Sequence, residues 1–403
     1  MYTLFIIKRI IEDIFIYLFV LFGRIKASLN KKIKEEYRIF FFFPFYHIGG
    51  AEKVHFSIAQ ATGGSDCIIF FTRKSQNDLY YDEFKKSGCR LIDISRFTDN
   101  KWLYFNNLFF RGIISYYINS QKKKPVVFNG QCNFAYKLSP WLRKDIKQYE
   151  LIHSFNTFSW IRIPFLPFIN KSVMISRVRI EDHLKQYSKL KIPVSYKERI
   201  AYIINGIEIP FPAPQKNYFT DTLKVVYVGR GTEEKRVHLI AEIAEKCSQQ
   251  KINAEFSFVG EVKGSVPEQF HSYCNFYGNI SDREKLSKIY NESHILIMAS
   301  TTEGFPMAVM EAMAYGLAIL STDVGDLKVH IENGKNGFLV SDNETEGSIV
   351  SESVKYIDGL FNNRELLQAI GRNNIEYANQ NFSIKQFNIA YRNLLNENGE
   401  WNK

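Results

Sequence analysis

The stretch TTEGFPMAVMEAMAYGLAILSTDVGD, residues 301–326, follows directly on the apolar run HILIMAS of residues 294–300. That run predicts a strand buried on both faces, and residues 317–324 predict a second one. Between them, residues 306–315 predict a helix that starts at Pro306, because proline suits the first helical position. Strand, helix and strand in close succession indicate a parallel sheet, so this stretch decides the fold class as α/β.

The same alternation of apolar runs and helical segments extends through most of the 403 residues. Residues 206–221 interrupt it with three prolines, Pro210, Pro212 and Pro214, which indicate a stiff linker. We therefore predict two Rossmann-like, doubly wound domains that face each other across a cleft. The other predicted strands cover residues 38–45, 67–72, 89–94, 125–130, 149–155, 172–177, 199–204, 223–229, 254–260 and 275–280, and the other predicted helices cover 51–61, 237–250, 283–292, 346–361, 364–380 and 383–395.

The charge of the chain is distributed unevenly between its halves. Residues 1–210 carry 33 Lys and Arg against 17 Asp and Glu, and residues 211–403 carry 19 against 25, which gives net charges of +16 and −6. A basic first half favours an anionic partner such as a membrane face or a phosphorylated acceptor, although a solvated basic surface is the alternative. The five cysteines show no metal-ligand spacing and predict reduced thiols.

The N-terminal sequence LFIIKRIIEDIFIYLFVLFG is strongly apolar, yet charges interrupt it. Lys8 with Glu12 and Arg9 with Asp13 are spaced to form one polar stripe on a helix. The uninterrupted run 14–22 is too short for a bilayer crossing, which needs about 20 residues, and no signal-peptide cleavage site follows. The pattern suits a helix in the membrane plane, with a helix packed on its own protein as the alternative. The basic residues behind it are Arg24, Lys26, Lys31, Lys32 and Lys34.

Two carboxylates, Glu303 and Glu311, stand before and within the predicted helix of the opening stretch. No good N-cap side chain precedes Pro306, so the N–H groups of Met307 and Ala308 are open to an anion. Ligands of open α/β sheets collect at the carboxyl ends of strands, where this loop lies. One carboxylate on each side of a bound diphosphate would suit a sugar and a ribose. A glycosidase pair about 5 to 9 Å apart is the alternative.

The residues EGFPMAVMEAMAYGLAILSTDVGD and NGKNGFLV resemble the glutamate-x7-glutamate region of the family 4 retaining glycosyltransferases, which have the GT-B fold. The resemblance implies that the helix start meets the diphosphate of a nucleotide-sugar donor. It also implies that the second glutamate holds the ribose diol and that the first lies beside the donor sugar. The donor-binding residues implied in this stretch are Glu303, Phe305, Pro306, Met307, Ala308 and Glu311.

Three further stretches are similar to the same family. In YVGRGTEEKR (227–236), Arg230 and Lys235 would neutralise the donor diphosphate and its departing charge, with surface cations as the alternative. FYHIGGAEKV (45–54) places Gly49 and Gly50 where backbone can approach the donor closely. ELIHSF (150–155) places His153 near the reacting sugar, with a structural histidine as the alternative. The catalytic residues implied are His153, Glu303, Arg230 and Lys235.

The chain departs from the family pattern at three places. Gly325-Asp326 stands where the family has two glycines, Val329 where it has a glutamate, and Arg236 where a glycine often follows the lysine. Other classes fit less well. A dehydrogenase needs a third glycine that GRGTEE lacks, a P-loop motif is absent, and so is the Asp-x-Asp of metal-dependent transferases. The basic run 122–124 without a nucleic-acid module predicts no nucleic-acid partner.

We therefore predict a metal-independent hexosyltransferase-type enzyme of the retaining class. It would move a sugar from a nucleotide-diphosphate sugar, its co-substrate in place of a cofactor, to a saccharide or lipid-linked acceptor. Its expected place is the cytoplasm, peripheral on the inner membrane, in capsule, O-antigen or lipopolysaccharide synthesis. The alternatives are a non-catalytic GT-B-like partner protein and a GT-B nucleotide-sugar epimerase. The predicted segments are 1–36 (N-terminal amphipathic, membrane-associating), 37–205 (acceptor domain), 206–221 (linker), 222–382 (donor domain) and 383–403 (helix crossing back to the first domain).

Overall fold

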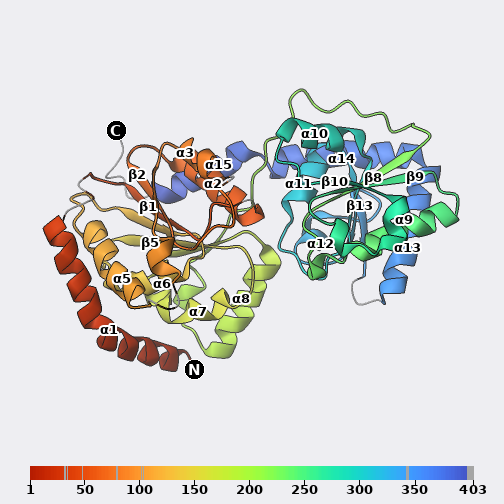
Figure 1. Ribbon diagram of the computed structural model, residues 1–403. Helices are drawn as coiled ribbons and strands as arrows, with labels where there is room; N and C mark the ends of the chain where they lie inside the picture. Colours follow the sequence, from red (N-terminus) through yellow and green to blue (C-terminus); the bar gives the residue numbers. More distant parts are fainter. Residues whose placement is uncertain are drawn as a thin grey trace. The chain divides into compact units, whose positions relative to one another are not determined.

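The chain folds into two compact units, each built around its own parallel sheet (Figure 1). The first unit comprises Met1–Ile204 and the segment from Lys385 onward, and the second comprises Asn205–Ile384. The predicted pair of Rossmann-like α/β domains is thereby confirmed. The computed structural model describes residues 1–30, 33, 35–47, 49–78, 80–100, 102, 104–341 and 345–396.

The sheet of the first unit has seven strands in the order β3-β2-β1-β4-β5-β6-β7, and neighbouring strands pair in parallel. Each of the seven apolar runs predicted in this half overlaps one of them. The central strand β1 is five residues long, IFFFF, and buried along its whole length, as expected of a parallel strand with helices on both faces. The strands are β1 (Ile39–Phe43), β2 (Cys67–Phe71), β3 (Arg90–Asp93), β4 (Val126–Asn129), β5 (Lys147–Ile152), β6 (Lys171–Met174) and β7 (Ile200–Tyr202).

Helices cover both faces of this sheet. On one face, Phe40 and Phe42 of β1 share a core cluster with residues of α5 (Tyr104–Asn119) and α6 (Asn133–Leu138). On the other face, Phe43 stacks on His55 of α2 (Gly50–Thr62), and Phe128 contacts Tyr391 of α15 (Ile384–Leu395). The remaining α-helices of this sheet's unit are α1 (Tyr2–Asn30), α3 (Tyr81–Lys85), α4 (Ser95–Thr98), α7 (Phe158–Ile161) and α8 (Arg177–Leu190).

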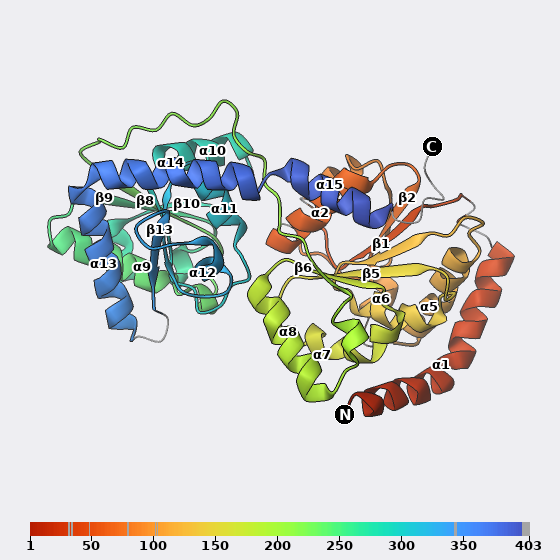
Figure 2. The ribbon, with the colours of Figure 1, turned by 180° about the vertical axis from the view of Figure 1, so that it is seen from behind.

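The N-terminal helix α1 runs along the outer side of α5, as both views show (Figures 1 and 2). The two helices approach closely at Gly23 and Gly112. A Cβ on Gly23 would lie 2.1 Å from the carbonyl oxygen of Phe109, and one on Gly112 would lie 2.0 Å from that of Val20. The predicted helix is therefore present and packs on the protein. Lys31, Lys32 and Lys34 lie outside the described residues, and within the described part every helix is too short or too polar to cross a membrane.

The second unit has a six-stranded sheet in the order β10-β9-β8-β11-β12-β13, again parallel throughout. Five of its strands overlap predicted runs. The edge strand β13, which begins at a glycine and has four residues, was not predicted as a strand. The strands are β8 (Leu223–Val228), β9 (Ala254–Val259), β10 (Cys274–Gly278), β11 (Ile295–Met298), β12 (Ala318–Thr322) and β13 (Gly337–Val340).

One large core cluster joins this sheet to α9, α13 and α14. It includes Val225 and Ile297 from central strands, Ile240 from α9 and Ile357 from α13, and all four side chains are fully or almost fully buried. The α-helices of the second unit are α9 (Val237–Gln249), α10 (Arg283–Glu292), α11 (Met307–Ala314), α12 (Leu327–His330), α13 (Glu346–Asn362) and α14 (Arg364–Asn381).

Candidate active site

The strand order of the second sheet marks one position as the natural place for a ligand. From β8 the chain proceeds to β9 and β10 on one side, and then returns to β11, β12 and β13 on the other. Open α/β sheets bind ligands outside the carboxyl ends of the two strands where the order reverses. The loop after β8 holds residues 229–236 and the loop after β11 holds residues 299–306, so both lie at that position.

Lys235 and Glu303, which come from these two loops, contact each other. Nζ of Lys235 lies 2.6 Å from Oε1 of Glu303, and Oγ of Ser300 donates to the same carboxylate oxygen at 2.7 Å. The two charged side chains are only 14% and 9% exposed. An ammonium group has three N–H donors, so Lys235 can bind Glu303 and an incoming anion together. Ser300 was not singled out from the sequence, although it stands three residues before Glu303.

Arg230 lies on the exposed rim of the same loop. Its guanidinium is 3.8 Å from the carboxylate of Glu234, and the side chain is 77% exposed. The hydroxyl of Tyr227 donates to the carbonyl oxygen of Arg230 at 2.8 Å and so fixes the backbone beneath it. Arg230 is thus a solvated cation that can swing toward a ligand, whereas Lys235 is already held in place.

Arg236 stands where the family resemblance of the sequence implied a glycine, and its backbone has the conformation that favours glycine. Its φ of +45° lies in the left-handed region, which favours glycine because a Cβ atom is crowded there. The side chain compensates by tying two loops together. Its Nε donates to the carbonyl oxygen of Ala299 at 2.6 Å, and its Nη2 donates to that of Ser300 at 3.3 Å. Arg236 therefore fixes the end of β11 beside Lys235.

Helix α11 begins at Met307, one residue later than predicted. Pro306 has ψ of 134°, so it is the extended N-cap residue, and no side chain caps the helix. The carbonyl oxygen of Pro306 accepts from the N–H of Val309 at 3.1 Å. The N–H groups of Met307 and Ala308 precede the helix's own hydrogen-bond ladder, so they point outward with the positive end of the helix dipole.

The loop before α11 is held by the fold behind it. Phe305 is buried and packs on the rings of His330 and Phe382, with centroid distances of 4.2 and 5.3 Å. Gly325, at φ +60°, lies so close that a Cβ there would be 2.4 Å from the carbonyl oxygen of Glu303. The side chain of Phe305 therefore positions the loop, and the departure from two glycines to Gly325-Asp326 retains the glycine that the packing requires.

Glu311 lies in the second turn of α11 and meets a residue that the sequence did not suggest. The hydroxyl of Tyr290, in the last turn of α10, donates to Oε2 of Glu311 at 3.0 Å. Tyr290 is fully buried, and burial, reinforced by the nearby Glu311 carboxylate, raises its pKa well above the usual value. The phenol therefore stays a proton donor and orients Glu311.

In the first unit, His153 directly follows β5 and contacts a second histidine. Its Nε2 lies 3.0 Å from Nε2 of His55 on α2, and its backbone N–H donates to the side chain of Gln131. Burial lowers the pKa of His153 to about 4 and holds that of His55 well below its usual value, so both rings are neutral near pH 7. One ring must then donate to the other. His55 was missed because a lone histidine on an apolar helix resembles a core residue.

Gly49 and Gly50 lie at the start of α2, as predicted. Gly49 is the N-cap residue, and a Cβ there would lie 2.1 Å from Oε2 of Glu52. A Cβ on Gly50 would meet nothing within 4 Å. The missing side chain of Gly49 thus makes room for the Glu52 carboxylate, while the backbone of Gly50 is open to a ligand.

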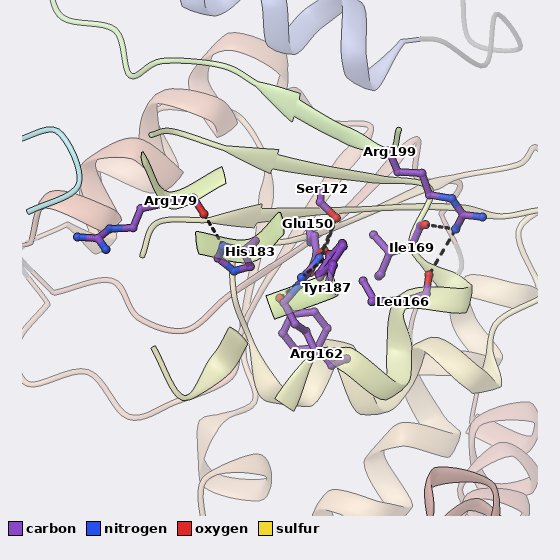
Figure 3. A network of polar contacts seen from close by, with 10 residues as sticks. Glu150, Arg162, Leu166, Ile169, Ser172, Arg179, His183, Tyr187 and Arg199 are labelled. Carbon is purple, nitrogen blue, oxygen red and sulfur yellow. Dashed lines mark hydrogen bonds and ion pairs between the residues drawn. The ribbon is translucent and has the colours of Figure 1, made fainter. Parts of the chain in front are cut away.

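A buried polar network supports the strand that ends at His153 (Figure 3). Glu150 of β5 forms an ion pair with Arg162, in which Nε of Arg162 lies 3.1 Å from each carboxylate oxygen. Ser172 donates to Glu150, and Arg162 donates to the hydroxyl of Tyr187 at 2.7 Å. Burial alone would raise the pKa of Glu150, but the Arg162 charge and the hydrogen bonds lower it. The network fixes β5 three residues before His153.

Two parallel α/β units are the components of the GT-B fold, and the second unit carries cations and an uncapped helix start at its switch point. Residues 211–377 match the family described as glycosyl transferases group 1. The O-antigen biosynthesis glycosyltransferase WbnH of Escherichia coli is 33% identical over 174 residues, which are 43% of this chain and 46% of that protein. The aligned part of this chain thus spans about half the length of that relative.

Solved structures show the same fold over most of the chain. HepE of Anabaena, in complex with UDP and glucose, superposes with a TM-score of 0.69 at 16% identity and covers 89% of this chain and 99% of its own. The apo form of the lipopolysaccharide outer core galactosyltransferase WaaB has a TM-score of 0.67 at 17% identity and covers 89% and 99%. At these identities the likeness concerns the fold.

Proposed function

We propose that this protein is a retaining glycosyltransferase that moves a hexose-type sugar from a nucleotide-diphosphate sugar to a saccharide or lipid-linked glycan. The observation that carries the proposal is the Lys235–Glu303 contact beside the start of α11, at the switch point of a GT-B donor unit. A buried cation, a carboxylate and free amides together match a diphosphate that carries a sugar. The O-antigen name of one relative supports a polysaccharide acceptor.

Each residue has a role that its position allows. The N–H groups of Met307 and Ala308, with Lys235 and Arg230, would bind the diphosphate oxygens. Glu311, oriented by Tyr290, would accept hydrogen bonds from the ribose hydroxyls. Glu303 would accept from a hydroxyl of the donor sugar. His153, held neutral by burial, would position that sugar by a hydrogen bond.

In the proposed reaction the bond between the anomeric carbon and the diphosphate oxygen breaks. A bond from that carbon to the acceptor oxygen forms on the same face, and the acceptor proton passes to the departing phosphate. Negative charge develops on the diphosphate as it leaves, so fixed cations stabilise the transition state more than the ground state. Lys235 and Arg230 supply that charge in a mechanism that we propose to be independent of a metal and of any cofactor.

We further propose that the reaction takes place at the cytoplasmic face of the inner membrane, in the synthesis of a cell-surface polysaccharide such as capsule, O-antigen or lipopolysaccharide. The net charge of +16 on residues 1–210 supports an acceptor carried by an anionic surface. We expect no nucleic-acid partner.

Thermal unfolding of the full-length protein with UDP, GDP, ADP and their sugars tests this function. A ligand at about 100 times its dissociation constant adds roughly 2.7 kcal/mol to the free energy of unfolding. We expect one base to stabilise the wild-type protein and to stabilise Lys235→Ala less. No shift with any nucleotide would refute the transferase, and a shift without sugar transfer to any glycan would favour the non-catalytic partner or the epimerase.

A further inference from the structure

The outward face of α1 carries an unbroken apolar stripe. Its members recur every three or four residues, which places them on one side of a helix. Their side chains are 47–79% exposed. Because α1 has 29 residues, the stripe runs for about 40 Å at 1.5 Å per residue. The members of this outer stripe are Leu4, Ile7, Ile11, Ile14, Leu18, Phe22, Ile25 and Leu29.

The face of α1 that meets the protein is distinct from the outer stripe. Its buried residues are the small or medium-sized Val20, Gly23 and Ala27. Arg9 and Asp13 also turn inward, where they pair at 3.2 Å and the Arg9 guanidinium lies 4.8 Å from the ring centroid of Phe168. An ordinary surface helix buries its apolar side and exposes its charges. Here the packed face already buries Val20, and Tyr2 and Phe5 pack against a core cluster. The outer stripe is a second apolar face that remains exposed, so packing on the protein does not explain it.

Aromatic residues before and at the start of α5 extend the apolar surface. Phe105 is 64% exposed and its ring centroid lies 5.4 Å from that of Phe19 on α1. Trp102, at 95% exposure, and Tyr104 are also exposed. Tryptophan and tyrosine are the side chains enriched where apolar chains meet lipid headgroups. Large exposed apolar patches on protein surfaces mark interaction sites.

We propose that the outer stripe, together with Trp102 and Phe105, is the surface by which the protein lies on an anionic lipid bilayer, with α1 parallel to the membrane plane. This inference rests on the proposed function, because a protein held on the membrane would meet an acceptor that is carried by a lipid of the same membrane. Lys8 and Lys26 are exposed on α1, and the first 210 residues carry a net charge of +16, which complements anionic headgroups. A second copy of the chain would gain nothing from that charge, because equal charges repel.

Cosedimentation of the full-length protein with lipid vesicles tests the proposal. One set of vesicles contains phosphatidylcholine with about one third phosphatidylglycerol as the anionic lipid, and the other contains phosphatidylcholine alone. The test variant carries Ile11→Ser, Ile14→Ser and Leu18→Ser, which remove apolar surface without changing charge. The matched control carries Val194→Ser, Phe219→Ser and Ile389→Ser, which are apolar positions 55–65% exposed elsewhere on the chain.

We expect the wild-type protein and the control to bind the anionic vesicles equally and to bind neutral vesicles less. The stripe variant should bind at least tenfold more weakly, and a second variant with Leu4→Ser, Ile7→Ser and Phe22→Ser should behave like it. Equal binding by the wild type and both stripe variants, or no binding by the wild type, would overturn the proposal. A wild-type dimer in sedimentation equilibrium that the stripe substitutions convert to monomer, without vesicle binding, would assign the stripe to a second copy instead.

The same variants separate this inference from the proposed function. None of the residues proposed to bind the nucleotide sugar lies on α1, so the stripe variant should show the wild-type thermal shift with nucleotides. Vesicle binding without any thermal shift by nucleotides would support the membrane-binding surface and refute the glycosyltransferase function. A thermal shift by a nucleotide without vesicle binding would support the glycosyltransferase function and refute the membrane-binding surface.

Discussion

Nζ of Lys235 lies 2.6 Å from Oε1 of Glu303, although 68 residues separate them in the chain. The contact joins the loops after β8 and β11, the two strands between which the order of the second sheet reverses. Without ligand, the carboxylate occupies one of the three donors of the ammonium group. The cation is therefore fixed in position before the donor arrives, which lowers the cost of reorganisation in the transition state.

The first prediction concerns Lys235. Lys235→Ala should lower kcat/KM at least about 100-fold, because loss of one fixed electrostatic contact to developing charge typically costs that much. Lys235→Arg should recover part of the loss, since it keeps the charge. Steady-state kinetics with the donor found by thermal unfolding measures both. Lys285→Ala, on the exposed face of α10, is the control and should change nothing; full activity in Lys235→Ala would exclude the diphosphate role.

The second prediction concerns the hydroxyl group of Tyr290, and the neighbouring Tyr315 serves as the control. Tyr290→Phe removes the hydroxyl that donates to Glu311 at 3.0 Å, so nucleotide affinity should fall by about 3- to 10-fold, as for the loss of one hydrogen bond of roughly 1 kcal/mol. Tyr315→Phe, whose ring stacks on Tyr290, should leave affinity unchanged. Calorimetric titration with the nucleotide compares the two. Equal affinities in both variants would show that Glu311 needs no positioning.

The third prediction uses the strained backbone of Arg236. Both Arg236→Gly and Arg236→Ala lose the hydrogen bonds to Ala299 and Ser300, but only glycine relieves the φ of +45°. The glycine variant should therefore be more stable than the alanine variant by about 1 kcal/mol. Denaturant unfolding of the two proteins measures the difference. If alanine were as stable as glycine, the strain would not exist.

Much of the fold could be predicted from the sequence because parallel strands buried on both faces are continuous apolar runs. All seven strands of the first sheet and five of the second overlap such runs. The strand β13 was not predicted, because four residues beginning with Gly337 are too short an apolar run to indicate a strand. Helix α8 was not predicted, because its sequence, RVRIEDHLKQYSKL, is mostly polar and shows little apolar periodicity.

The sequence suggested which residues form the candidate site, but it did not suggest which of them contact each other. Glu303, Glu311 and Lys235 stand out by position and by resemblance. The direct pairing of Lys235 with Glu303 depends on how two loops pack, which sequence spacing does not reveal. His55 was missed because it lies on a helix among apolar residues, where a histidine is usually part of the core. Tyr290 was missed because nothing in the mostly polar sequence of α10 distinguishes it from an ordinary buried aromatic residue.

The fourth prediction concerns the buried pair Glu150 and Arg162. Glu150→Gln should lower the free energy of unfolding by about 3 to 5 kcal/mol, because it leaves a buried charge unpaired. Replacing both residues, as Glu150→Leu with Arg162→Met, should cost much less. Denaturant unfolding near pH 7 gives both values. A loss in the double variant as large as in the single one would show that the charges themselves stabilise the fold.

The same pair sets a pH dependence whose sign follows from the lowered pKa of Glu150. A carboxyl group with a lower pKa in the folded state adds stability that is fully present above its unfolded value of 4.5 and is lost as the pH falls through the folded value. The wild-type protein should therefore lose stability below about pH 4.5 more steeply than Glu150→Gln. If the free energy of unfolding fell equally steeply with pH in both proteins, this prediction would be contradicted.

Release of nucleoside diphosphate from a panel of nucleotide sugars, with a glycan acceptor present, tests the central claim most directly. The wild-type protein should release one nucleoside diphosphate and form a product with the anomeric configuration of the donor, seen by NMR. Lys235→Ala should release it at least about 100-fold more slowly. No release from any nucleotide sugar, or a product of inverted configuration, would contradict the account.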